Sequence, residues 1–262
     1  IKSGYDCIVL DNFSNSTKEC IKQCEIIVGK SIKSVDVDLL DFDQTCDVFK
    51  NNKIEAVIHC AGFKSVGESV EFPLRYYHNN ITGSINLLRA MQEFKVSKIV
   101  FSSSATVYGT PKYLPIDEIH PIGDCSNPYG ITKFFIEKII EDHMKSINGS
   151  YIHLRYFNPV GASESGIIGE TPTGVPNNLF PYIADVAAGK RPEINVFGND
   201  YDTIDGTGVR DYIHIVDLAK GHTQAIKLIT STCAVQKVYN LGTGKGYSVL
   251  KVIEAYEKAC GK

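Results

Sequence analysis

Short apolar segments alternate with helical segments along the first part of the chain, and this alternation most constrains the fold. The apolar runs, which have the composition of buried parallel strands, lie at residues 7–10, 34–38, 56–60, 99–102 and 151–155. Apolar residues recur at helical spacing between them, at residues 42–51, 76–94 and 128–147. Strands that alternate with helices of this length predict a parallel sheet with helices on both faces. We therefore expect a doubly wound α/β fold.

A change of composition predicts a domain boundary near the middle of the chain. From Asn158 to Pro176 the sequence becomes rich in Gly, Pro and Asn, which is typical of irregular segments. We expect a first domain over residues 1–157 and a smaller, mixed α/β domain over residues 158–262, part of which packs back on the first. The second half is predicted to form a helix near 178–189, a strand at 195–197 and a helix at 216–229.

Tyr129 and Lys133 form a pair that can deprotonate an alcohol. They stand four residues apart in the helix predicted at 128–147, so both side chains emerge on one face. A free tyrosine has a pKa near ~10, and a cation beside the ring favours the phenolate and lowers that pKa. Ser104 ends one of the apolar strands. A Y-x-x-x-K spacing by itself is also typical of a surface tyrosine beside a solvated lysine.

Other polar residues stand where the predicted strands end, and ligands of such folds bind outside the carboxyl ends of the strands. These residues are Asp11, Ala61, Gly62, Ser102 and Tyr156. An acid in the position of Asp11 can accept hydrogen bonds from the ribose hydroxyls of adenosine and would repel a 2′-phosphate. A turn aspartate explains that single feature equally well.

Composition limits the partners and the compartment. A net charge of −3 gives no electrostatic reason to bind nucleic acid or anionic membranes. No apolar run approaches the ~18 residues that a membrane span needs. The eight cysteines include no C-x-x-C pair and no zinc spacing. They predict reduced thiols in a cytoplasmic protein with no metal site.

Several segments together resemble a known family. They include SSSATVYG at 102–109, LRYFNP at 154–159 and VRDYIH at 209–214, and further segments lie at 11–16, 59–69, 127–130, 176–182 and 195–201. In order and over nearly the whole chain they resemble the UDP-glucose 4-epimerase (UDP-galactose 4-epimerase) family, a group of extended short-chain dehydrogenases/reductases. The resemblance implies a Rossmann-type domain that retains NAD. It also implies reversible inversion at C4 of UDP-glucose and UDP-galactose through a 4-keto sugar, in galactose metabolism.

The resemblance also implies roles for individual residues. Tyr129 would take the proton of the 4-hydroxyl group, Lys133 would hold the nicotinamide ribose, and Ser104 would bind the sugar oxygen. The residues implied to contact NAD are Asp11, Asn12, Asn15, Ser16, Asp38, Leu39, Ala61, Gly62, Lys64, Asn79, Ser102, Tyr129, Lys133 and Tyr156. The residues implied to contact the UDP-sugar are Lys64, Ser104, Tyr129, Asn158, Asn178, Leu179, Asn195, Phe197 and Arg210. A homodimer through the helices at 76–94 and 128–147 is implied as well.

The chain departs from the family pattern at its ends and leaves alternatives open. The family's opening strand and its G-x-x-G-x-x-G loop are absent, and the family continues beyond residue 262. We therefore expect a fragment that folds poorly alone and whose own activity is open. The alternatives are another UDP-sugar 4-epimerase, for an N-acetylhexosamine or a pentose, a dinucleotide-binding sensor, or an inactive NAD-binding fragment. A 4,6-dehydratase is disfavoured because it needs an Asp-Glu pair where this chain has Ala105 and Thr106.

One glycine-rich segment resembles a phosphate loop but lacks its spacing. The segment Gly242–Gly246 does not follow the GxxxxGK[ST] pattern. We predict a structural turn there.

Overall fold

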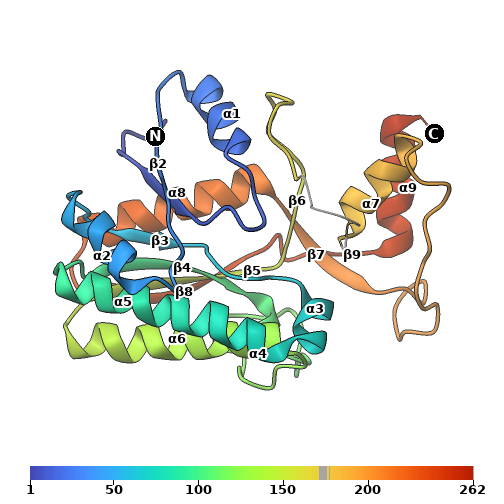
Figure 1. Cartoon of the computed structure of the whole chain (residues 1–262). Coiled ribbons are helices and arrows are strands. Elements are labelled where there is room, and N and C mark those ends of the chain that lie inside the picture. The colour runs from blue at the N-terminus through green and yellow to red at the C-terminus, as the bar shows by residue number, and fades with distance from the viewer. Residues whose placement is uncertain (171–175, 177, 262) are drawn as a thin grey trace. The chain divides into compact units, whose positions relative to one another are not determined.

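The computed structural model describes residues 1–170, 176 and 178–261, which belong to two compact units (Figure 1). Unit 1 contains residues 1–156 and 219–241, and unit 2 contains residues 157–218 and 242–262. The predicted boundary after residue 157 lies one residue from the first of these limits. The segment 219–241 belongs to unit 1, so the chain leaves this unit once and later returns to it.

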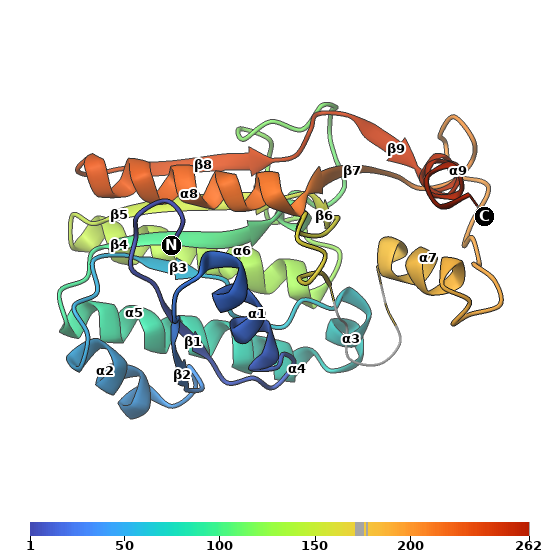
Figure 2. The same ribbon diagram turned by 90° about the horizontal axis from the view of Figure 1, so that it is seen from above.

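The main sheet of unit 1 is parallel, as predicted. Its strands, in spatial order, are β3 (Val57–His59), β4 (Lys98–Ser104), β5 (Ser150–Tyr156) and β8 (Gln236–Leu241). Two helices, α5 (Gly83–Glu93) and α6 (Pro128–Ser146), cover one face, and α8 (Ile215–Ser231) covers the other (Figures 1 and 2).

The alternation of side chains along β4 explains this layering. Ile99 and Phe101 point into the apolar cluster beneath α5 and α6, whereas Val100 between them belongs to the cluster beneath α8. Successive residues of a strand face opposite sides, so an unbroken apolar run suits a strand that is covered on both faces. The predicted doubly wound α/β fold is therefore confirmed.

The sheet is nevertheless not continuous. Strands β1 (Ile8–Asp11) and β2 (Lys33–Asp36) pair with each other in a separate parallel sheet, with α1 (Glu19–Val28) between them in sequence and α2 (Phe42–Lys50) after them. Within the described residues, β1 pairs only with β2, and β3 pairs only with β4. Ile58 in the middle of β3 is consequently 45% exposed, although its residue type suits a covered strand.

The predicted helices on either side of β4 are confirmed, and one contains a feature that the sequence pattern does not indicate. Between α3 (Val66–Glu71) and α5, the short helix α4 (Pro73–Tyr76) continues into a π-helical turn, η1 (Tyr77–Thr82). Such turns occur frequently at functional sites. Helix α6 begins where predicted because the Asn127 side chain accepts a hydrogen bond from the Gly130 amide, and Pro128 occupies the first turn.

Unit 2 is smaller and mixed, as predicted. Strand β6 (Asn158–Val160) is parallel to β7 (Val209–His214), and β9 (Gly246–Ser248) is antiparallel to β7. Helices α7 (Leu179–Ala187) and α9 (Val249–Cys260) lie in the same unit. Among the described helices of the chain, none is long and apolar enough to cross a membrane.

Two predictions for unit 2 have different outcomes. The strand predicted at residues 195–197 is wrong: this segment is irregular, and Phe197 is 87% exposed. A strand needs a neighbour for its backbone hydrogen bonds, and an apolar run alone does not supply one. The turn predicted at Gly242–Gly246 is confirmed, because the amides of Thr243 and Gly244 donate to the Asp211 carboxylate.

Candidate functional site

The three predicted catalytic residues meet in unit 1, where β4 ends and α6 begins. Ser104 is the last residue of β4, and Tyr129 and Lys133 lie in the first two turns of α6. The Ser104 side chain is near enough to the Tyr129 hydroxyl to lower the pKa of that phenol, although burial raises the pKa by more. The Nζ atom of Lys133 lies 6.0 Å from the centre of the Tyr129 ring. The structure therefore brings together the three groups that the sequence pattern selected.

Lys133 is a buried cation. Its Nζ atom donates to the Ser102 carbonyl oxygen at 2.7 Å and lies 4.8 Å from the centre of the Phe101 ring. Burial lowers the pKa of Lys133 to about 8, although the nearby Cys60 and Glu137 act in the opposite direction. The side chain therefore still carries its charge at neutral pH, in a place with little water to screen it.

The expected direction of the Tyr129 pKa is wrong for this structure. Burial raises the pKa of Tyr129, and the nearby Ser104 side chain lowers it by less. The main cause is the loss of solvent around the phenol, and the ammonium group of Lys133, which donates to the Ser102 carbonyl, does not offset it. A phenolate at Tyr129 therefore requires a further positive charge in the site.

Ser104 has two structural roles. Its Oγ atom accepts hydrogen bonds from the Thr106 amide at 3.2 Å and from the Thr106 hydroxyl at 2.9 Å, which caps the 3-10 helix η2 (Ala105–Tyr108). It also contacts the Tyr129 hydroxyl. The cap fixes the serine in place, so the hydroxyl that meets Tyr129 is already oriented.

The acidic residues predicted to bind adenosine are arranged at the end of β1. Asp11 Oδ1 accepts from the Phe13 amide at 2.7 Å and from the Ser16 hydroxyl at 3.2 Å. The Asn12 side-chain amide donates to Asp38 Oδ2 at 2.8 Å. The four predicted residues therefore form two hydrogen-bonded pairs, Asp11 with Ser16 and Asn12 with Asp38.

Two further predicted residues lie close to this group in the chain. Asn15 lies in the exposed loop after β1, and the Leu39 carbonyl accepts from Asn86 Nδ2 at 2.9 Å.

The segment after β3 is shaped by an asparagine that the sequence analysis did not select as a site residue. Gly62 has φ +141, and a Cβ atom there would lie 3.1 Å from Asn80 Oδ1. The same oxygen accepts from the Phe63 amide at 2.8 Å and from the side chain of the predicted residue Asn79 at 2.9 Å. Asn80 is buried within the π-helical turn η1. Its role depends on that turn, and no sequence pattern predicted the turn. Ala61 and Lys64 belong to the same segment and are exposed.

A second polar cluster surrounds Ser102. Its hydroxyl lies 3.0 Å from Cys60 Sγ and 3.3 Å from His222 Nε2, and His222 also forms a short hydrogen bond with the Tyr156 hydroxyl. Burial alone would raise the pKa of the Cys60 thiol, but hydrogen bonds from His222 and Ser102 outweigh it and lower that pKa. Sequence reasoning selected Ser102 and Tyr156 and missed His222 and Cys60.

The remaining predicted residues belong to unit 2. Asn158 lies on β6, and its side-chain amide donates to the Asp211 carbonyl at 2.9 Å. Asn178 precedes α7 and donates to Glu170 at 2.8 Å, and Leu179 is the first residue of that helix. Arg210 is exposed on β7, and its Nη1 donates to the Val209 carbonyl at 2.8 Å. Asn195 and Phe197 lie in the irregular segment and are exposed.

The chain is similar in sequence and in structure to known proteins. The chain is 56% identical over 264 residues to a UDP-glucose 4-epimerase of Bacillus subtilis (strain 168), covering 100% of this chain and 77% of that protein. A crystal structure of UDP-glucose 4-epimerase from Bifidobacterium longum in complex with NAD+ and UDP has a TM-score of 0.95 and 54% identity, with 99% and 77% of the two chains covered.

A second solved structure is similarly close. It is a UDP-glucose-4-epimerase from Stenotrophomonas maltophila with bound NAD and formylated UDP-arabinopyranose, with a TM-score of 0.95, 44% identity and coverage of 99% and 77%. The sequence profile described as "NAD dependent epimerase/dehydratase family" matches residues 1–242. The chain belongs to the NAD dependent epimerase/dehydratase family.

Proposed function

We propose that this protein catalyses the NAD-dependent, reversible interconversion of UDP-galactose and UDP-glucose. This is an isomerase reaction of galactose metabolism, and it passes through a 4-keto sugar. The observation that carries the proposal is the contact between Ser104 and Tyr129 with the buried cation of Lys133 beside them. Relatives of 56% and 54% identity that bear the name UDP-glucose 4-epimerase support the same reaction.

The residues of unit 1 fit NAD. Both hydrogen bonds that Asp11 accepts go to Oδ1, which leaves Oδ2 able to accept from a ribose hydroxyl of adenosine. Lys133 carries an ammonium group that, in this proposal, donates to the nicotinamide ribose. When bound, NAD supplies hydride transfer, and its oxidised nicotinamide ring carries a positive charge. The chain itself has no G-x-x-G-x-x-G loop for the pyrophosphate.

Tyr129 takes the proton of the sugar 4-hydroxyl group in this proposal. Because burial raises the pKa of Tyr129, the phenolate needs positive charge nearby, and Lys133 supplies part of it. Ser104, held by its contacts with Thr106, binds the same sugar oxygen and relays its proton. Proton transfer by a placed side chain typically contributes about 10²–10⁴-fold to the rate.

The UDP-sugar contacts remain a proposal drawn from residue type and position. Arg210 is suited to the diphosphate because its planar guanidinium donates two parallel hydrogen bonds. Asn158 on the neighbouring strand β6 and Asn178 before α7 offer amide donors and acceptors. The full proposed set is Lys64, Ser104, Tyr129, Asn158, Asn178, Leu179, Asn195, Phe197 and Arg210.

A UDP-pentose is the second candidate substrate. It is favoured by the Stenotrophomonas maltophila neighbour, whose structure holds formylated UDP-arabinopyranose. A direct competition between UDP-galactose and UDP-arabinopyranose for turnover distinguishes the two substrates, because the better substrate has the higher kcat/KM. An N-acetylated UDP-hexosamine belongs in the same competition.

We also propose a cytoplasmic homodimer. The eight cysteines carry free thiols, which suits a reducing compartment. Helices α5 and α6 expose Ile85 and Phe135, which are 38% and 44% accessible and offer apolar contact area to a second copy. Sedimentation of the wild type and of Phe135→Glu tests the dimer: the variant is expected to be monomeric.

The test of the proposed reaction is a coupled assay of UDP-galactose conversion to UDP-glucose. Tyr129→Phe is expected to lose about 10²–10⁴-fold in kcat while NAD still binds, because only the proton acceptor is removed. Tyr5→Phe, at an exposed tyrosine that is not among the proposed site residues, is the matched control and should keep full activity. Equal activity of Tyr129→Phe and wild type would rule out the proposed base.

A further inference from the structure

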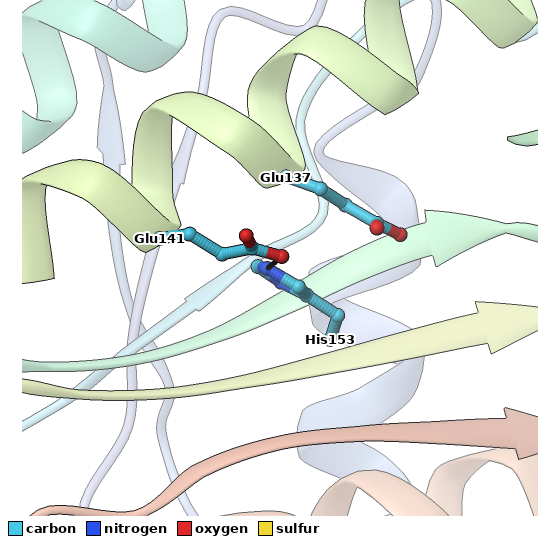
Figure 3. A group of neighbouring side chains, drawn as sticks. All are labelled: Glu137, Glu141 and His153. Carbon is cyan, nitrogen blue, oxygen red and sulfur yellow. Dashed lines mark ion pairs between the residues drawn. The ribbon is translucent and has the colours of Figure 1, made fainter. Parts of the chain in front are cut away.

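A second cluster of chemically active side chains lies between α6 and β5, apart from the residues assigned to catalysis. Glu137 and Glu141 stand one helical turn apart on α6, and the ring of His153 on β5 is directed at Glu141, while the Glu137 carboxylate lies to one side of the ring (Figure 3). One ligand atom from each residue can be chosen so that the three atoms all lie within 4.8 Å of one another.

Burial of the polar His153 ring costs free energy, and the reason for that burial is not evident from its contacts. Its side chain is fully buried, and neither ring nitrogen has a partner at hydrogen-bonding geometry among the residues that the structure describes. Its ring stacks on Tyr151 at 4.7 Å and meets the Phe101 ring edge-on at 5.9 Å, and these contacts satisfy neither nitrogen. Buried polar atoms are almost always paired, so two orphaned nitrogens in one side chain require an explanation.

The distance from His153 to Glu141 distinguishes a direct hydrogen bond between the two side chains from the binding of one metal ion by both. His153 Nε2 lies 3.7 Å from Glu141 Oε1, which exceeds the usual N–H···O range. Two ligands of one tetrahedral zinc ion, each at about 2.0–2.1 Å, lie roughly 3.4 Å apart. The observed separation is therefore closer to that of two ligands on one ion than to that of a direct hydrogen bond.

The charges around the cluster also suit a cation. The other oxygen of Glu141, Oε2, faces Lys138 at 2.9 Å, so Oε1 remains directed inward. Glu137 is fully buried; its Oε1 atom accepts hydrogen bonds from Arg155 and Ser103, and its Oε2 atom accepts one from Arg155. A carboxylate has about four lone-pair sites, so Oε2 retains capacity for one further partner. Arg155 pairs with Glu137, and Lys138 and Lys145 both lie on the Oε2 side of Glu141, so the Oε1 atom of Glu141 faces His153 rather than a cation.

We propose that Glu137, Glu141 and His153 bind a divalent transition-metal ion, with zinc as the occupant that the ligands favour. One imidazole and two carboxylates form a ligand set that zinc accepts, and water completes the coordination. The ion ties α6, the helix that carries Tyr129 and Lys133, to β5. This proposal is independent of the epimerase reaction.

The experiment measures zinc retained by the full chain after treatment with a chelator and dialysis against limiting zinc. The expected result is one zinc per chain and a rise of several degrees in Tm on zinc addition. His153→Leu and Glu141→Gln are expected to lose both effects. Glu254→Gln, an exposed glutamate that pairs with Lys258 on α9, is the matched control and should keep both.

Cobalt substitution separates this site from the cysteines. The eight free thiols can also bind metals, and a cobalt–thiolate pair gives an intense charge-transfer band in the near ultraviolet that histidine and carboxylate ligands do not give. The proposal expects visible ligand-field bands without that band. It fails if the wild type retains no zinc, if Glu141→Gln and His153→Leu retain as much as the wild type, or if the cobalt is bound by thiolate.

Discussion

Tyr129 and Lys133 illustrate how burial controls chemistry at the level of single residues. Burial raises the pKa of Tyr129 and lowers that of Lys133, because both charged forms lose solvation. The proposed catalytic phenolate is therefore unfavourable until the site gains positive charge. Ligand binding and activation of the base are expected to be coupled for this reason, since a cationic nicotinamide ring provides that charge.

Lys133 predicts a characteristic dependence of stability on pH. Its pKa is about 8 in the folded chain against an ordinary value of 10.5, so between these values the unfolded chain holds a proton that the folded chain has released. The free energy of unfolding contributed by this residue therefore rises with pH across that window, by roughly 3 kcal/mol in all. Below about pH 8 the burial penalty is fully present.

Urea unfolding at several pH values checks this prediction. The difference in unfolding free energy between Lys133→Met and the wild type should shrink as pH rises from about 8 to about 10.5. Lys145→Met, which removes an exposed lysine from the same helix, should show no such trend. The same pH trend in both variants would mean that Lys133 is not the source.

At the scale of elements, α6 organises the centre of unit 1. Tyr129, Lys133, Glu137 and Glu141 follow one another at intervals of four residues, so they form a single row along the helix. The first two serve the proposed catalysis, and the last two belong to the proposed metal site. Glu137 also anchors α6 to β5 through Arg155, at 2.7 Å between Oε2 and Nη2.

The pair of Glu137 and Arg155 predicts a strongly non-additive double-mutant cycle. Burial would raise the pKa of Glu137, but the hydrogen bonds and charge of Arg155 outweigh it and hold that pKa below its usual value. Arg155→Met therefore leaves a buried charge unpaired and should cost about 3–5 kcal/mol.

The double variant Glu137→Leu/Arg155→Met should cost less than the sum of the single variants in urea unfolding, because neither charge then remains buried. The exposed pair Glu254 and Lys258 is the comparison cycle, and its coupling should be close to zero. Additive costs at Glu137 and Arg155 would contradict the reading of a coupled ion pair.

The two sheets of unit 1 should differ in local stability. Strand β4 has a partner on each side and apolar clusters on both faces, whereas β1 and β2 pair only with each other. Two-stranded sheets are marginal by themselves, and local opening needs little free energy where few contacts are lost. Amide hydrogen exchange should therefore be much faster in β1 and β2 than in β4. Equal protection in both sheets would show that they unfold as one cooperative unit.

At the scale of the whole molecule, the proposed NAD residues lie in one unit, whereas the proposed UDP-sugar residues are divided between both, with Lys64, Ser104 and Tyr129 in unit 1. The residues proposed to contact NAD lie in unit 1, and the UDP-sugar residues Asn158, Asn178 and Arg210 lie in unit 2. A ligand that binds only the folded state stabilises that state by mass action. At one hundred times its Kd it raises the free energy of opening by about 2.7 kcal/mol, and amide exchange becomes correspondingly slower. The two ligands should therefore protect different parts of the chain.

Hydrogen exchange with each ligand tests this division. NAD should slow exchange around β1, β4 and the first turns of α6. UDP-glucose added to the NAD complex should extend the protection to β6, β7 and the start of α7. Protection of unit 2 by NAD in the absence of UDP-glucose would contradict the assignment of the ligand groups. A chain that shows no cooperative unfolding and no NAD effect would instead support the expectation that it folds poorly alone.

The sequence by itself predicted the strands β1 to β5, the helices α2, α5 and α6, the parallel sheet, and the position of Tyr129 and Lys133 on one face of α6; it did not predict α1 or β8. These are local properties: strand and helix periodicity follow from backbone geometry, and a spacing of four residues is one helical turn wherever the helix lies. The strand-end positions of Asp11 and Ser104 follow from the same local patterns.

The tertiary structure alone decided how distant residues meet and how much solvent they lose. His222 reaches Ser102 from a position 120 residues away, and His153 becomes unpartnered only because it packs against α6. The split between the two sheets and the raised pKa of Tyr129 arise in the same way. Strand pairing, side-chain contact and desolvation depend on which elements become neighbours in space. Local sequence patterns do not specify those neighbours.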